Sequence, residues 1–250
     1  MARDLIDLLW RDHPDAPRGG SRGPRARVTT TEAVDAAVAL ADAEGLDAVT
    51  VRRLAADLGI SAMALYTHVG SRDDLLVLMA DAAHAAMPRP PHAEADWRAS
   101  VRAVADANLA LLTDHAWLLD VTDQRTALGP GTIAKYDHEL AALDALALGD
   151  VDRDAALTFV LDFVRGAARA RRPDPHGAAM AASWDVWGPR LAAYLGDAHP
   201  LAQRVGAAAG AELGAAYSPD HAWHFGLDRV LDALAALAPA TGGLDGLASA

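Results

Sequence analysis

The residues best able to do chemistry lie in the stretch Thr50–Val69, TVRRLAADLGISAMALYTHV, and at Arg72 just beyond it. Arginine, tyrosine and histidine side chains bind phosphate oxygens. An arginine such as Arg52 can also bond O6 and N7 of guanine together, which discriminates that base by about 1–3 kcal/mol. Within the stretch, Ala55 is small enough to let two helices cross closely, and Gly59 can take the positive φ of a tight turn. This spacing indicates a helix-turn-helix that contacts DNA.

Each of these residues has a more ordinary interpretation when it is taken alone. Tyr66 fits a half-buried core position, His68 a surface histidine, and the pair Arg52 and Arg53 a solvated helix face. Their occurrence in this order, in a segment whose only acidic residue before Arg72 is Asp57, favours DNA binding.

Apolar residues recur at helical spacing along most of the chain, which predicts an all-α fold. Thr29, Thr50 and Ser61 are placed as N-caps, Glu32 completes a capping box with Thr29, and Gly45 ends the first helix. Asp152 is expected to cap a later helix. After the first helix, which starts at Thr29, the sequence predicts helices over Val51–Leu58, Ala62–Thr67, Asp73–Met87, Trp97–Thr113, Thr132–Leu148, Arg153–Arg172, Pro189–Tyr194, Leu201–Leu213 and His221–Leu237.

The composition narrows the class of protein. The chain has 250 residues, 34 Asp and Glu against 22 Lys and Arg, a formal net charge of −12 and no cysteine, which excludes disulfides and thiolate sites. No apolar run approaches the about 18–20 residues that span a bilayer, and Asp4 and Asp7 interrupt the apolar start, so we expect a soluble, cytoplasmic protein. The acidic balance argues against a uniform coat of nucleic acid but allows a local basic patch.

Composition also suggests where the chain divides. Residues 1–28 are expected to form a flexible Arg/Pro/Gly-rich arm, either a solvated linker or a cationic strand along a DNA groove. A DNA-binding domain is expected over 29–75, a larger helical domain over 76–238 and a disordered tail over 239–250. The arm residues that would contact DNA are Arg18, Arg22, Arg25 and Arg27.

Two motifs, AVDAAVALADAEGLDAVTVRRLAADLGIS and ALYTHVGSRDDLL, make residues 29–87 resemble the DNA-binding domain of the TetR (tetracycline-repressor) family of bacterial regulators. The run FGLDRVLDALAAL, from Phe225, resembles the last dimerisation helix of the tetracycline-repressor-like subgroup. The start of the chain, LLW followed by an Arg/Pro/Gly stretch, is similar to actinobacterial members.

The resemblance implies roles for particular residues in DNA binding. The base-reading positions are Arg52, Ala62, Met63 and Ala64, and the phosphate-contacting positions are Thr50, Tyr66, Thr67, His68 and Arg72. Ala62, Met63 and Ala64 carry no hydrogen-bonding side chain. Specificity would therefore come from methyl contacts with thymine, from Arg52 and from DNA shape.

The resemblance also implies a two-fold dimer, a palindromic operator and a small-molecule pocket in the C-terminal domain. The dimer would form through Asp152–Arg172 and His221–Leu237, with Phe159, Phe163, Phe225, Leu227, Val230, Leu231 and Leu234 at the interface. Tryptophans and a few polar anchors are candidates for the pocket, although any one tryptophan is more simply a core residue. These candidates are Trp97, Asn108, His115, Trp117, Arg165, Trp184 and Trp187.

We therefore expect a ligand-responsive, homodimeric transcriptional regulator, most simply a repressor that a small-molecule effector releases from its operator. The alternative is a dimeric helical small-molecule-binding protein whose DNA-reading head is weak or non-functional. The sequence has no Gly-rich phosphate loop, nucleophile elbow or His-Glu-x-x-His helix, which disfavours an enzyme. We expect no cofactor and no metal, because His221-x-x-His224 lacks a third ligand at a defined distance.

Overall fold

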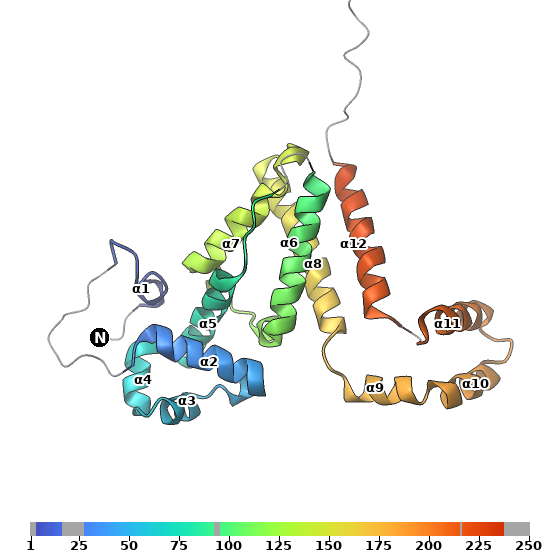
Figure 1. Cartoon of the computed structure of the whole chain (residues 1–250), viewed down its shortest axis with the longest axis horizontal. Helices are drawn as coiled ribbons and strands as arrows, with labels where there is room; N and C mark the ends of the chain where they lie inside the picture. The colour runs from blue at the N-terminus through green and yellow to red at the C-terminus, as the bar shows by residue number, and fades with distance from the viewer. Residues whose placement is uncertain (1–3, 17–27, 93–95, 216, 238–250) are drawn as a thin grey trace, which may run out of the picture.

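Every regular element is a helix in the residues that the computed structural model describes, 4–16, 28–92, 96–215 and 217–237 (Figure 1). The expected all-α fold class is confirmed. In chain order the elements are α1 (Leu5–Leu9), α2 (Thr30–Glu44), η1 (Leu46–Ala48), α3 (Val51–Asp57), α4 (Ala62–Val69), α5 (Arg72–Ala86), α6 (Trp97–Asp114), η2 (Ala116–Asp120), η3 (Gln124–Leu128), α7 (Pro130–Ala141), η4 (Asp144–Leu146), α8 (Asp150–Ala170), α9 (Pro175–Ala182), α10 (Trp184–Leu195), α11 (Pro200–Leu213) and α12 (Pro219–Ala235).

Helices α2, α3 and α4 form an N-terminal unit, which we call the head. Its helices begin at the predicted caps: Thr29 and Glu32 form a capping box, Thr50 accepts a hydrogen bond from the N–H of Arg53, and Ser61 caps α4. Each cap satisfies a backbone N–H that the first turn of a helix leaves without a partner. The core of the head consists of buried apolar side chains, among them Val34, Ala37, Leu54, Leu65 and Val69.

Helix α5 joins the head to the rest of the chain. One side of it packs against α2 and α4, and the other side packs against α7. Leu75, Val77 and Met79 are each 0% exposed, so α5 is covered on more than one face. Because one continuous helix lies in both contacts, the orientation of the head is tied to the position of α7 (Figure 1).

The contact between α5 and α7 is close because α7 begins with two glycines around a proline. Gly129 offers no capping side chain, and Asp81 of α5 instead accepts a hydrogen bond from the N–H of Thr132 at 2.8 Å. A Cβ at Gly131 would lie 2.3 Å from the Asp81 carbonyl oxygen. Burial raises the pKa of Asp81, and the hydrogen bonds from the start of α7 counteract part of that rise.

A second apolar core lies between α6, α8 and α12. Its buried side chains come from all three helices and include Val104, Leu157, Val160, Leu227 and Leu231. The expected helix Thr132–Leu148 is wrong in its second half, since α7 ends at Ala141 and Ala147 takes a left-handed φ of 51°. The chain turns there because Leu143 and Leu146 enter the core, each 1% exposed.

Helix α8 starts at Asp150 after Gly149, so Asp152 lies in the first turn and is not the N-cap that we expected. A carboxylate in the first turn still interacts favourably with the helix dipole.

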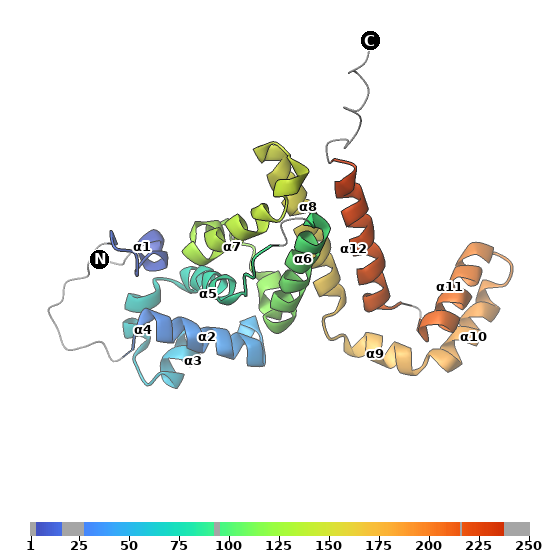
Figure 2. The same cartoon turned by 45° about the horizontal axis from the view of Figure 1, so that its top comes forward.

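Helices α9, α10 and α11 stand away from the other helices in both views (Figures 1 and 2). Neither α10 nor α11 has a buried residue, although Trp187, Leu191, Tyr194 and Val205 are large and apolar. The predicted helix Pro189–Tyr194 begins earlier, at Trp184, with Pro189 inside it. Helix α9 was not predicted, because its sequence PHGAAMAA contains a glycine and no clear apolar period.

The expected flexible arm is wrong for residues 5–9, which form α1. Asp4 caps this helix, and Leu8 and Leu9 are 1% and 3% exposed because α1 packs on α5. Arg18, Arg22, Arg25 and Arg27 lie outside the described residues, as does the tail 239–250.

The close approach of α5 and α7 yields the first testable prediction. Gly131→Ala should lower the free energy of unfolding by about 1–3 kcal/mol, because the added methyl group must displace the α5 backbone. Gly206→Ala is the matched control, since a Cβ at Gly206 of α11 meets nothing within 4 Å and should stabilise the helix by about 0.5–1 kcal/mol. Urea unfolding measures both, and equal effects would contradict the close contact.

Candidate nucleic-acid interface and ligand core

The turn between α3 and α4 has the geometry of a helix-turn-helix. Gly59 takes a φ of 66°, and the N–H of Ile60 donates to the Ala55 carbonyl at 3.0 Å. A left-handed φ favours glycine at this position, as the sequence indicated. Thr30 of α2 donates from its hydroxyl to the His68 carbonyl at 3.0 Å, which fixes the C-terminal end of α4 against α2.

Helix α4 presents several side chains that the fold does not bury. Met63 is 75% exposed and Tyr66 is 43% exposed, while Ala62 is also exposed and Ala64 is half-buried. A large apolar side chain that the core leaves open to solvent indicates a contact surface more than a structural role. Ala62 and Met63 therefore lie where methyl contacts with thymine are possible.

The two adjacent arginines of α3 have different surroundings. Arg53 donates to Glu44 at 3.0 Å and to Asp57 at 3.0 Å, and these bonds raise the pKa of its guanidinium. Arg52 is exposed and makes no hydrogen bond or ion pair with any residue that the structure describes. Of this pair, Arg52 alone keeps a guanidinium free for a ligand, which sequence reasoning could not tell because Glu44 lies on another helix.

The residues predicted to contact phosphates differ in how far their side chains are already bonded within the chain. Arg72 donates from Nε to the Val49 carbonyl at 3.2 Å and from Nη2 to the Leu46 carbonyl at 3.4 Å, so its guanidinium supports the loop before α3. Thr67 donates to the Ala64 carbonyl at 2.6 Å. Tyr66 and Thr50 are exposed, and His68 is half-buried.

Two predicted pocket residues contact the head instead of lining a pocket. The indole Nε1 of Trp117 donates to Asp42 Oδ1 at 2.7 Å, and His115 Nδ1 lies 2.8 Å from the same oxygen. Asp42 is on α2, so these bonds tie the end of α6 and η2 to the head. A second tie joins Arg125 of η3 to Asp74 of α5 at 2.7 Å.

A buried polar cluster lies between α6 and α7. Asn108 donates to the Glu139 carboxylate at 2.5 Å, and Lys135 Nζ lies 2.7 Å from it. Burial lowers the pKa of Lys135, and the charge of Glu139 opposes this. Asn108 was among the predicted pocket residues, but Lys135 and Glu139 were not, because their i, i+4 spacing reads as an ordinary surface ion pair.

Beside this cluster, His84 of α5 bonds Thr132 of α7 through Nδ1 at 2.8 Å. Burial first, and then the charges of Lys135 and Arg165, lower the pKa of His84 to about 3. The imidazole is therefore neutral at physiological pH, and with Asp81 it makes a second polar contact between α5 and α7.

The remaining predicted pocket residues are not brought together. Trp97 is half-buried beside Arg98, Arg165 pairs with Asp162 on the outside of α8, and Trp184 and Trp187 lie on the distant α10. A cavity of about 250 Å³ does lie among the C-terminal helices, beside the chain after α5, and its walls include Met87, His92, Ser100, Val104 and His138. None of the seven predicted pocket residues lines this cavity.

The predicted dimer residues divide into two groups. Leu227, Val230, Leu231 and Leu234 are at most 6% exposed in the core of their own chain, so they are wrong as an exposed interface. The apolar stripe of α12 faces α6 and α8, which is where helical periodicity places a core stripe. Phe159 and Phe225 are 48% and 60% exposed, and Phe163 stacks on Trp223 with ring centroids 5.4 Å apart.

The geometry defines the class of protein: a helix-turn-helix with an exposed second helix, joined by one helix to a larger helical domain. Residues 33–79 match the family described as bacterial regulatory proteins, tetR family, and residues 89–238 match the tetracyclin repressor-like C-terminal domain. The chain belongs to the TetR family, whose members are DNA-binding transcription regulators and not enzymes.

Relatives agree with this assignment. The HTH-type transcriptional repressor DrrR1 of Streptomyces coeruleorubidus is 34% identical over 249 residues, covering 95% of this chain and 86% of that protein. Apo ActR of Streptomyces coelicolor superimposes with a TM-score of 0.71 at 25% identity, covering 86% of this chain and 98% of that one. ActR in complex with (S)-DNPA gives a TM-score of 0.70 at 23% identity, covering 85% and 99%.

Among the described residues there is neither a membrane-spanning helix nor a metal-binding cluster. No helix among them has the length and apolarity to cross a membrane. No group of three or more His, Cys, Asp or Glu side chains in this part of the chain is arranged to hold a metal ion.

The arginine contacts yield a prediction with an internal control. Arg52→Ala should lose sequence preference on DNA with an unchanged melting temperature, because its guanidinium is free. Arg53→Ala should lose less preference, because Glu44 and Asp57 already hold that side chain. Arg72→Ala should lower the free energy of unfolding by about 1 kcal/mol, because two carbonyls lose a donor. Competition binding on duplex mixtures measures the first two, and equal losses would contradict the assignment to Arg52.

The half-buried His84 yields a pH prediction. Its pKa is about 3 in the folded chain against 6.5 for the free side chain, so the unfolded chain binds the proton more tightly. Stability should therefore be intact above pH 6.5 and fall below it by up to about 1.4 kcal/mol per pH unit. His84→Gln should flatten this dependence between pH 7 and 5, whereas His224→Gln on the exposed surface should keep it. Urea unfolding at each pH measures this dependence. The same pH dependence of the free energy of unfolding in the wild type and in His84→Gln would contradict the lowered pKa of His84.

Proposed function

We propose that the chain is a ligand-responsive transcriptional repressor that binds a palindromic operator as a homodimer and is released by a small-molecule effector. The observation that carries the proposal is the exposed face of α3 and α4, which carries an unpaired Arg52 and an exposed Met63, on a head that α5 joins to the larger helical domain. Action on bacterial operator DNA would place the protein in the cytoplasm.

On this proposal, residues 29–75 bind DNA and residues 76–238 bind the effector and form the dimer. Arg52, Ala62, Met63 and Ala64 face the base edges, while Thr50, Tyr66, Thr67 and His68 approach the phosphates. Arg72 acts on DNA mainly by fixing the loop before α3, since its donors already bond Val49 and Leu46.

The dimer forms around the exposed aromatic side chains of α8 and α12. Phe159 and Phe225 are large, apolar and open to solvent on helices that pack against each other. Helices α10 and α11, which bury nothing in one chain, supply further apolar surface for a second copy to cover. Two-fold symmetry of this interface would present two heads to a palindrome.

The effector binds in the C-terminal domain and weakens operator binding through α5. ActR has been crystallised with (S)-DNPA and with actinorhodin, which supports a response to small organic molecules. Coupling of this kind is commonly about 1–3 kcal/mol and is reciprocal, so operator DNA weakens effector binding equally. The buried cluster of Asn108, Lys135 and Glu139 lies between α6 and α7 and offers the polar anchors of such a site.

One observation favours a second candidate, a dimeric small-molecule-binding protein with a weak reading head. Ala62 and Ala64 carry no hydrogen-bonding group where α4 would meet the bases. This candidate predicts dimerisation without sequence-selective DNA binding.

Selection from random duplex DNA, at about 0.15 M salt, separates the two candidates. The wild-type protein should enrich a palindrome whose half-sites lie one helical turn apart, or a multiple of it. Phe159→Glu with Phe225→Glu should give a monomer that enriches none, because a charge would oppose burial of that face. The control Val186→Glu with Leu201→Glu adds the same two charges to exposed apolar positions of α10 and α11. It should weaken the dimer less than the phenylalanine pair does, so that it still enriches the palindrome. A dimeric wild type that enriches nothing, also after refolding from denaturant to remove bound ligand, would contradict the repressor proposal.

A further inference from the structure

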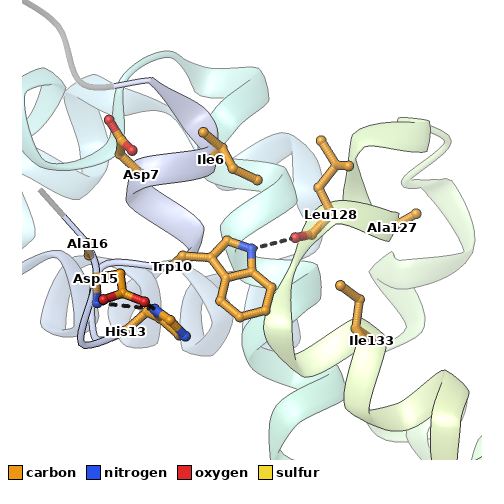
Figure 3. Close-up of a pocket in the computed structure, with 9 residues that line it drawn as sticks. All are labelled: Ile6, Asp7, Trp10, His13, Asp15, Ala16, Ala127, Leu128 and Ile133. Carbon is orange, nitrogen blue, oxygen red and sulfur yellow. Dashed lines mark hydrogen bonds and ion pairs between the residues drawn. The ribbon is translucent and has the colours of Figure 1, made fainter.

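A hollow of about 550 Å³ lies between the N-terminal segment and the start of α7 (Figure 3). One wall comes from α1 and the turn after it, residues that precede the region matched by the TetR family, and the other comes from η3 and α7. The hollow is thus separate from the C-terminal cavity beside Met87 and His92. Its size falls within the about 300–1,000 Å³ of small-molecule sites.

Packing and hydrogen bonds within the chain hold both walls of the hollow in place. Leu8 and Leu9 anchor α1 on α5, and Arg11 donates to Thr31 of α2 at 3.1 Å. The indole Nε1 of Trp10 donates to the Leu128 carbonyl at 2.9 Å, which joins the two walls directly (Figure 3). A hollow built on such contacts needs little rearrangement to receive a ligand.

The surface of the hollow is apolar and aromatic. Ile6 and Trp10 on one wall face Leu128 and Ile133 on the other (Figure 3). Ile6, Leu128 and Ile133 are 42%, 46% and 44% exposed, so three large aliphatic side chains remain uncovered around an indole. A flat aromatic molecule would pack well between these aliphatic side chains and the indole ring.

The charged groups that line the hollow are both carboxylates, Asp7 and Asp15, and no lysine or arginine is among the lining residues that the structure describes. The Asp15 N–H donates to His13 Nδ1 at 3.2 Å, which holds the imidazole ring beside Asp15. The lining therefore repels anions and attracts cations.

We propose that this hollow is a second small-molecule site, which binds a planar organic cation by stacking against Trp10 between the two walls with its charge toward Asp7 and Asp15. The indole face adds to the attraction for the cation, because its ring quadrupole is negative on that face. The bound molecule bridges α1 and α7, and so strengthens the contact between the N-terminal segment and the C-terminal domain.

Berberine, a planar aromatic cation, is a suitable probe in a titration of the full chain without DNA. Asp7→Asn with Asp15→Asn should weaken its binding about fivefold, because the attraction of one half-exposed and one exposed carboxylate is lost. The matched control Asp106→Asn with Asp114→Asn changes the net charge equally at exposed positions of α6 and should bind as the wild type does. The anion 1-anilinonaphthalene-8-sulfonate should not displace the probe.

The location is tested by nuclear magnetic resonance of the indole N–H groups. The Trp10 resonance, assigned by its absence in Trp10→Phe, should shift on addition of berberine while that of the buried Trp223 stays in place. Binding that shifts other indole resonances but not Trp10, equal affinity in the two double variants, or no binding would each overturn the proposal. Binding only after Arg18, Arg22, Arg25 and Arg27 are replaced by Gln would overturn it too, since the chain's own arginines would then be the occupant.

Discussion

The contact between α5 and the first turn of α7 is the constraint on which the rest of the structure depends. Asp81 lies in α5 but caps α7, and the glycines at 129 and 131 let the two helices approach closely enough for that bond. His84 repeats the connection one turn later through Thr132. Because these bonds are partly buried, a movement of one helix away from the other leaves polar groups without partners in a place that water reaches poorly. Since α5 also forms part of the core of the head, α7 sets where the head lies.

Three further contacts reinforce this arrangement at its edges. Asp42 of α2 accepts from Trp117, Asp74 of α5 pairs with Arg125, and Trp10 bonds the Leu128 carbonyl. All three join the N-terminal part of the chain to η2 or η3, the short turns that lead from α6 into α7. A ligand that moves α6 or α7 therefore acts on the head through several bonds at once, which is the physical basis for a repressor that responds to an effector.

Local signals in the sequence predict the head well. Caps at Thr29, Thr50 and Ser61, and the turn at Gly59, depend on residues a few positions apart, and the structure confirms them. The pocket and interface depend on packing between distant segments, which periodicity does not encode. The sequence predicts Trp117 in a pocket, since its bond to Asp42, 75 residues away, leaves no local signal. It also predicts the stripe of α12 between subunits, although that stripe faces the core of its own chain. Helix α1 was missed because five residues are too few for a period to show.

The distance between the head and the C-terminal core is the most direct test of this account. Because the chain has no cysteine, Ala56→Cys on α3 and Ala145→Cys in η4 can carry two spin labels on exposed positions. Pulsed electron paramagnetic resonance, with excess unlabelled protein to suppress signals between subunits, then gives the distance within one chain. The account predicts a single narrow distribution that shifts or broadens in Gly131→Ala and stays unchanged in Gly206→Ala. A folded Gly131→Ala protein with the wild-type distribution would show that the contact between α5 and α7 does not set the position of the head.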